Sequence, residues 1–115
     1  MGVDFSHGDA RWSYSGFQAF RRRLAAEIGI ESLTAMEGYD GDEPWTPYES
    51  DVIVKLLNHS DCDGDLPPEH LPAIAARLRE LVSAWPDDQY DKQQAIYLAE
   101  GMEMAATDDE PLTFL

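Results

Sequence analysis

The sequence predicts a mainly α-helical domain, a small bundle of about four helices, from three observations. Apolar residues make up 43% of the 115 residues, a normal share for a globular protein. They recur at spacings of three and four in several segments, and residues that start or stop helices bound those segments. A chain of this length supports one hydrophobic core, so we expect a single domain over residues 1–115.

The first predicted helix spans residues 17–28. Its apolar residues fall on one helical face: Phe17, Phe20, Leu24 and Ile28. Ser13 or Ser15 can cap its start, and Gly29 follows its end as a C-cap glycine does. We interpret the arginine cluster Arg21–Arg23 as a solvated helix face that pairs with acids elsewhere in the chain.

A second helix is predicted from Pro47 to about Asn58. Thr46 is placed as the N-cap, Pro47 as the first helical residue and Glu49 three residues after the cap. The segment has a broad apolar face made of Tyr48, Val52, Ile53, Leu56 and Leu57. We therefore expect a helix that lies in the centre of the core.

Two longer helices are predicted in the second half of the chain. The first ends before Pro86 and carries apolar residues at helical spacing: Leu71, Ile74, Leu78, Leu81, Val82 and Trp85. The last begins at a cap supplied by Asp87 or Asp88 and reaches about Thr107. Gly101 inside it costs about 1 kcal/mol of helix propensity, so we expect another helix to approach closely there.

The two chain ends carry short segments that can form strands. Val3-Asp4-Phe5 is a candidate edge strand, and Pro111 ends the helical pattern before Leu112-Thr113-Phe114-Leu115. We therefore expect the termini to pair as a short ribbon.

The charge is strongly acidic, with 23 acids, 8 bases and a net charge of −15. Residues 1–30 carry three acids and four bases, whereas residues 31–115 carry 20 acids and four bases. Such a field repels nucleic-acid phosphate and anionic membranes, so we expect no direct binding to either. It favours a basic protein surface or a metal ion as partner, although acidity can also serve solubility alone.

The compartment that the sequence favours is the cytoplasm. A single cysteine forms no internal disulfide, and no apolar run reaches the length of a membrane span. The first residues also lack the basic and apolar regions of a secretion signal.

The acidic segment 37–45 is the candidate partner surface. It carries no basic residue, and its site residues are Tyr39, Asp40, Asp42, Glu43 and Trp45. Aromatic anchors beside charged groups are common in binding surfaces. The two aromatic residues are equally suited to fold back as a lid over the core, so both interpretations stay open.

The segment 59–70 is the candidate metal site. Its carboxylates alternate as the first ligands of a calcium loop do: Asp61, Asp63 and Asp65, with Glu69 as a further ligand. Leu66 stands where such a loop needs glycine, and Pro72 stands where it needs glutamate. A full EF-hand is therefore excluded, whereas a partial or weaker calcium or magnesium site stays open.

Two alternatives stay open for this segment. A zinc site would use His59, Cys62 and His70 with an aspartate, although Cys62 has no second cysteine at zinc-site spacing. A structural interpretation makes Asp63-Gly64 a turn and Asp65 the cap of the next helix. An enzyme is not favoured, because the surrounding carboxylates oppose a Cys62 thiolate and no catalytic motif is present.

Three blocks of the chain resemble a group of small bacterial proteins of actinobacterial type. They are Asp4–Tyr14, Leu56–Gly64 with its His-Ser-Asp-Cys-Asp-Gly motif, and Leu98–Met102 together with the terminal Phe114. The group has no established activity. The resemblance implies a bacterial, single-domain, cytoplasmic protein and transfers no catalytic or binding residue.

Taken together, these features predict a non-enzymatic acidic interaction protein. Its concrete form is an immunity or inhibitor protein that binds a basic nuclease or toxin, because a field of this sign mimics phosphate and steers association. The alternative is a structural or regulatory protein that binds a divalent cation at Asp61–Asp65.

Overall fold

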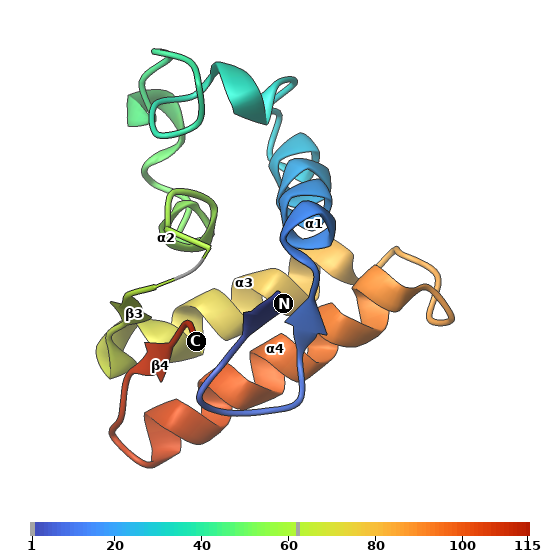
Figure 1. Cartoon of the computed structure of the whole chain (residues 1–115), viewed down its shortest axis with the longest axis vertical. Coiled ribbons are helices and arrows are strands. Elements are labelled where there is room, and N and C mark those ends of the chain that lie inside the picture. Colours follow the sequence, from blue (N-terminus) through green and yellow to red (C-terminus); the bar gives the residue numbers. More distant parts are fainter. Residues whose placement is uncertain (1, 62) are drawn as a thin grey trace.

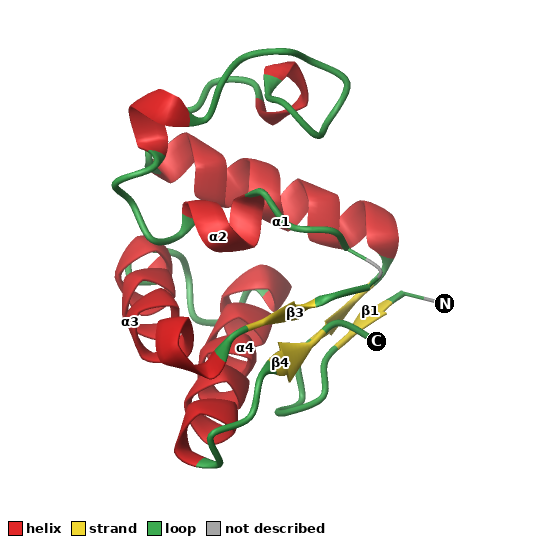
Figure 2. Ribbon diagram, turned by 90° about the vertical axis from the view of Figure 1, so that its left-hand side faces the viewer, coloured by secondary structure: helices red, strands yellow, loops and turns green. Residues whose placement is uncertain are grey.

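Four α-helices form the frame of the molecule (Figure 1). The computed structural model describes residues 2–61 and 63–115. Within these residues the helices are α1 (Tyr14–Glu27), α2 (Val54–Leu57), α3 (Leu71–Val82) and α4 (Tyr90–Thr107). Figure 2 shows α3 and α4 side by side, with α1 and α2 on one side of that pair. The prediction of a mainly helical single bundle of about four helices is confirmed.

Two short antiparallel strand pairs lie beside the chain ends (Figure 2). The pairs are β1 (Val3–Asp4) with β2 (Arg11–Trp12), and β3 (Asp65–Leu66) with β4 (Leu112–Thr113). Phe5 bridges Phe114, and the Leu115 amide donates to the Asp4 carbonyl over 2.9 Å. The predicted pairing of the two termini is therefore confirmed, and it joins the two strand pairs to each other.

The start and end of α1 follow from the sequence signals. The Ser13 hydroxyl accepts the Gly16 amide over 3.0 Å, as an N-cap side chain does. At the other end Gly29 adopts a φ of 92°, a left-handed conformation that favours glycine. The Ile30 amide then reaches back to the Ala25 carbonyl over 2.9 Å, so that the helix ends in a closed turn.

The prediction of a helix over residues 47–58 is wrong for most of that segment. The segment begins as a 3₁₀ turn, η2 (Thr46–Tyr48), continues through turns and becomes helical only in α2. The Asp51 carboxylate accepts the Ile53 amide over 3.1 Å and thereby competes with the helical backbone pattern at this point. The same carboxylate also accepts three hydrogen bonds from Arg77, which hold the turn against α3.

The Asp51–Arg77 pair predicts a stability contribution that depends on pH. Burial favours the neutral Asp51 carboxyl, but the hydrogen bonds from Arg77 and Ile53 outweigh burial and lower the pKa of Asp51 below its ordinary 3.8. A lowered pKa stabilises the fold above that ordinary value, and the contribution is lost as the pH falls through the lowered value.

We expect Asp51→Asn to lower the free energy of unfolding at pH 7 by about 1 kcal/mol. The deficit relative to the native chain should shrink below pH 3.8. Urea unfolding at several pH values measures this deficit, and Glu49→Gln, at an exposed position, is the control. A deficit that stays constant from pH 7 to about 2 would contradict the pairing.

The ends of α3 and α4 differ in detail from the prediction. α3 ends at Val82, before the predicted end, yet Trp85 beyond it is buried and donates to the Glu27 carboxylate over 3.1 Å. Neither predicted aspartate caps α4, whose N-cap is Gln89. Asp87 instead lies 3.1 Å from the Lys92 ammonium, so its charge pairs with a lysine in the first turn of the helix.

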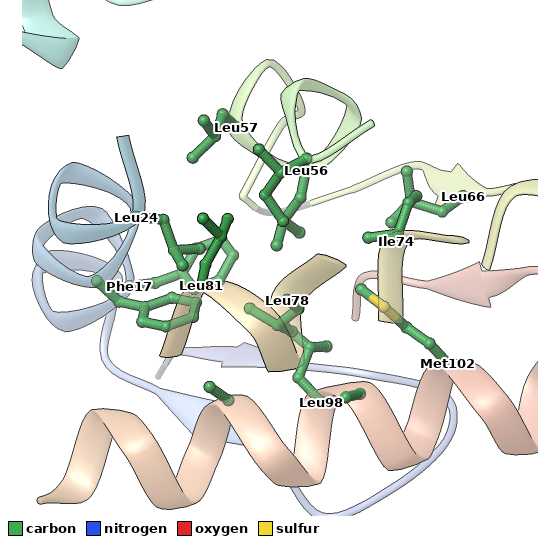
Figure 3. Packing of buried hydrophobic residues seen from close by; sticks show 14 of the residues in the cluster. Phe17, Leu24, Leu56, Leu57, Leu66, Ile74, Leu78, Leu81, Leu98 and Met102 are labelled. Atoms are coloured by element: carbon green, nitrogen blue, oxygen red, sulfur yellow. The ribbon is translucent and has the colours of Figure 1, made fainter. Parts of the chain in front are cut away.

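The core is one cluster to which all four helices contribute (Figure 3). Leu78 and Leu98 meet between α3 and α4, and Leu56 from α2 points toward them. Aromatic rings continue the core toward the chain ends: Phe5, Trp12, Phe17, Phe20 and Phe114. The described part of the chain contains no helix long and apolar enough to cross a membrane.

Gly101 allows the loop between β1 and β2 to lie against α4. A Cβ built on Gly101 would collide with the His7 carbonyl oxygen, and one built on Gly8 would lie 2.8 Å from the Gly101 Cα. The predicted close approach is therefore present, but the partner is this loop and not another helix.

We expect Gly101→Ala to lower the free energy of unfolding by about 2 kcal/mol, because the backbone clash outweighs the gain of about 1 kcal/mol in helix propensity. Chemical denaturation measures the change, and the exposed neighbour Glu100→Ala is the control. Unchanged or increased stability of the Gly101 variant would show that the contact is loose.

Candidate functional site

The segment 59–70 is held by backbone contacts around His59. The His59 Nδ1 atom lies 2.7 Å from the Ser60 carbonyl oxygen, and Nε2 lies 3.0 Å from that of Asp65. The ring stacks on Phe114 at a centroid distance of 4.1 Å. Both ring nitrogens therefore lie against carbonyl oxygens, and neither nitrogen is directed at a zinc ion in this conformation.

The predicted calcium ligands are spread along the segment. Asp61 is half-buried, Asp63 and Asp65 are exposed, and Asp65 lies in β3, where it pairs with Thr113. Glu69 is exposed and His70 half-buried in the 3₁₀ turn η3 (Pro68–His70). Among residues 2–61 and 63–115, no three ligand atoms from this segment lie within 4.8 Å of one another.

Cys62 lies outside the described residues, so the zinc alternative is not located by the structure. Ligand atoms of His7, Asp108 and Glu110 do lie within 4.8 Å of one another, and His7 Nε2 is 3.4 Å from Glu110 Oε1. The sequence gives no signal for this group, because His7 lies about a hundred residues before Asp108 and Glu110. Only the pairing of the termini brings the three side chains together.

Arg21 is the residue whose position differs most from the sequence prediction. Its exposed fraction is 4%, whereas the sequence placed it on a solvated face with Arg22 and Arg23. It follows Phe17 by four residues and precedes Leu24 by three, so it lies on the buried face of α1. That spacing was visible in the sequence and distinguishes Arg21 from the exposed Arg22.

The buried guanidinium is surrounded by carbonyls and rings. Nη1 donates to the His59 carbonyl and more weakly to that of Leu56 at 3.5 Å. The guanidinium carbon lies 4.6 Å from the centroid of Phe17 and 5.4 Å from that of Tyr39. Nε is buried and has no hydrogen-bond partner among the described residues.

A pocket of about 460 Å³ opens beside Arg21. Its lining joins α1 to the segments around residues 38 and 60: Gln18, Arg21, Gly38, Tyr39, Asn58, His59, Ser60 and Asp61. Burial lowers the pKa of Arg21 because it disfavours the charged guanidinium, whereas the charges of Tyr39 and Asp61 act to raise that pKa. For Tyr39 burial has the opposite effect and raises the pKa, because the charged form of this group is the phenolate. The Tyr39 hydroxyl donates to the Leu57 carbonyl over 2.6 Å. The start of the predicted metal segment is thus one wall of a polar pocket.

In the predicted partner surface the carboxylates are exposed, whereas the indole ring is buried. Asp40, Asp42 and Glu43 are exposed, while Trp45 is buried and donates to the Glu37 carbonyl over 2.9 Å. The half-buried Tyr39 lies 6.4 Å from Trp45 between ring centroids. Trp45 is therefore not an exposed anchor. Both aromatic residues instead fold back against the molecule, as the lid interpretation predicts.

The basic residues are largely engaged within the molecule. Arg21 is buried, and the bases in ion pairs with carboxylates are Arg11, Arg23, Arg77, Arg79 and Lys92. By contrast, Asp40, Asp42 and Glu43 have no basic nitrogen of residues 2–61 and 63–115 within 4.0 Å. The exposed charge of this segment is therefore uncompensated.

Comparison of the chain with protein-family models, with curated proteins and with solved structures finds no match.

Proposed function

We propose that the protein is a non-enzymatic interaction protein that binds a basic protein surface through Asp40, Asp42 and Glu43, which we call the acidic face. Its concrete form is an immunity or inhibitor protein of a bacterial cytoplasm that covers the cationic site of a nuclease or toxin. The sign of the charge disfavours nucleic acid and anionic membranes as direct partners, because both are negatively charged.

The observation that supports the proposal most is that the acidic face is exposed, uncompensated and held in place. Its carboxylates stand in a segment that extends away from α3 and α4, at the far end of α1 (Figure 1). Trp45 and Tyr39 anchor that segment through hydrogen bonds to backbone carbonyls. A fixed loop loses less conformational entropy on binding, so its charges are arranged before the partner arrives.

Binding assays with charge variants test this proposal. The probe is a purified small nuclease of high isoelectric point. One variant carries Asp40→Asn, Asp42→Asn and Glu43→Gln, and the control variant carries Glu100→Gln, Asp108→Asn and Asp109→Asn. Both lose three negative charges, but the control residues lie on α4 and directly after it.

We expect the native chain to bind with an affinity that falls steeply with added salt, because the Debye length shrinks from about 10 Å at 0.1 M to about 3 Å at 1 M. The acidic-face variant should bind more weakly than the control variant at each salt concentration. Equal loss in both variants, or binding indifferent to ionic strength, would contradict the proposal.

The alternative, a calcium or magnesium site at Asp61, Asp63 and Asp65, stays a prediction. It is supported by the alternation of the three carboxylates in the sequence, and the described conformation does not bring all three within 4.8 Å of one another.

A further inference from the structure

Arg21 carries a positive charge at a buried position. Its side chain is almost fully buried, and no carboxylate of the described residues lies within 4.0 Å of it. Taking a charge out of water is costly unless hydrogen bonds or an opposite charge compensate it. The carbonyls of His59 and Leu56 supply part of that compensation, and the Nε group receives none from the described residues.

The pocket beside Arg21 has the size and lining of a site for a small molecule. Its volume of about 460 Å³ lies within the range typical of ligand pockets, roughly 300 to 1,000 Å³. Gln18, Asn58 and Ser60 add polar side chains to the wall. The pocket is therefore suited to a polar ligand that complements the guanidinium.

Asp61 decides which class of ligand fits. It lines the same pocket, yet it makes no ion pair with Arg21 within 4.0 Å. A purely anionic ligand would meet both the Asp61 carboxylate and the field of a chain with net charge −15. A purely cationic ligand would meet Arg21. A molecule of zero net charge that carries both signs avoids both penalties.

We propose that this pocket binds a small zwitterion of the amino-acid class, with its carboxylate at Arg21 and its ammonium group at Asp61. This inference goes beyond the proposed function and does not depend on it, because it concerns a different ligand and different side chains. The carboxylate supplies the charge-assisted partner that the guanidinium lacks in the free protein.

Nuclear magnetic resonance titration of the full-length protein tests the proposal. Each standard amino acid is added singly, up to about 10 mM, tenfold above a dissociation constant of 1 mM. Acetate and methylammonium serve as probes that each carry one of the two charges of glycine. We expect saturable shifts of the amide signals of residues 18, 21, 38, 39 and 58–61 with an amino acid, and much weaker shifts with either single-charge probe.

Two matched variants make the test specific. Asp61→Asn removes the group that should hold the ammonium, and Asp63→Asn removes the same charge two residues away at a position outside the pocket lining. We expect Asp61→Asn to weaken amino-acid binding about tenfold or more and to leave acetate binding equal or stronger, while Asp63→Asn has little effect. Both variants replace non-core residues, so folding should be retained.

Three results would overturn the proposal. They are no saturable shift at the pocket with any amino acid, acetate binding as tight as amino-acid binding, and equal effects of the two variants. None of these results bears on the basic-protein partner, whose binding is read through Asp40, Asp42 and Glu43 with a different probe.

Discussion

Replacing Phe17 with alanine is expected to lower the free energy of unfolding by about 4 kcal/mol. Phe17 is fully buried, and its ring lies 5.3 Å from Trp12 and 6.3 Å from Phe114 between centroids. It therefore joins α1 to both chain ends. The guanidinium of Arg21 also lies over its face, so the substitution removes apolar burial, ring contacts and a cation–π contact together.

Tyr97→Ala is the matched control, because it removes an aromatic ring that is 41% exposed on α4. Urea unfolding followed by circular dichroism measures both variants. Surface substitutions typically change stability by less than about 0.5 kcal/mol, so the two variants should differ severalfold. Similar losses in both would contradict the placement of Phe17 at the centre of the aromatic cluster.

Arg21→Ala should lower the free energy of unfolding by about 3 kcal/mol, the second largest effect that we predict. The substitution removes the hydrogen bond to the His59 carbonyl and the weaker one to the buried Leu56 carbonyl. The same change removes the cation that lies near the rings of Phe17 and Tyr39. It also opens a cavity on the buried face of α1.

Arg22→Ala is the control, because it makes the same change one residue along α1 at an exposed position. Its effect should stay within about 0.5 kcal/mol. A second variant, Arg21→Met, restores much of the apolar volume and isolates the cost of the lost hydrogen bonds. Equal stability of the Arg21→Ala and Arg22→Ala variants would show that the guanidinium is not buried in solution.

The long helices could be predicted from the sequence because local signals and tertiary packing agree there. In α1 and α3, apolar spacing predicted the buried face, and Gly29 ends α1 as predicted. Ser13 is one of the two caps that the sequence offered, although α1 begins at Tyr14, before the predicted residue 17. Where two local signals competed, prediction failed. The strong start signal at Thr46 was overridden by Asp51, whose carboxylate binds both a local amide and Arg77 in a distant helix.

The candidate site was predictable only in part, for a different reason. The segment around His59 is marked in the sequence by its carboxylates, histidines and cysteine, whereas no such cluster marks Arg21. A buried arginine is uncommon, so the general preference of arginine for the surface outweighed its position between Phe17 and Leu24. The pocket also needs Gly38 and Tyr39, which come from a separate segment, and only the fold places them beside α1.

The measurement that tests most directly how the segment 59–70 is held is thermal unfolding in EDTA, followed by unfolding with calcium or magnesium added singly. We predict the same unfolding midpoint in all three conditions, because Arg21 and the His59 contacts hold the segment without an ion. An ion at a hundredfold excess over its dissociation constant would add about 2.7 kcal/mol, a rise of several degrees at this chain length. Such a rise, abolished by Asp61→Asn with Asp63→Asn, would contradict this interpretation and establish the carboxylates of the segment as a metal site.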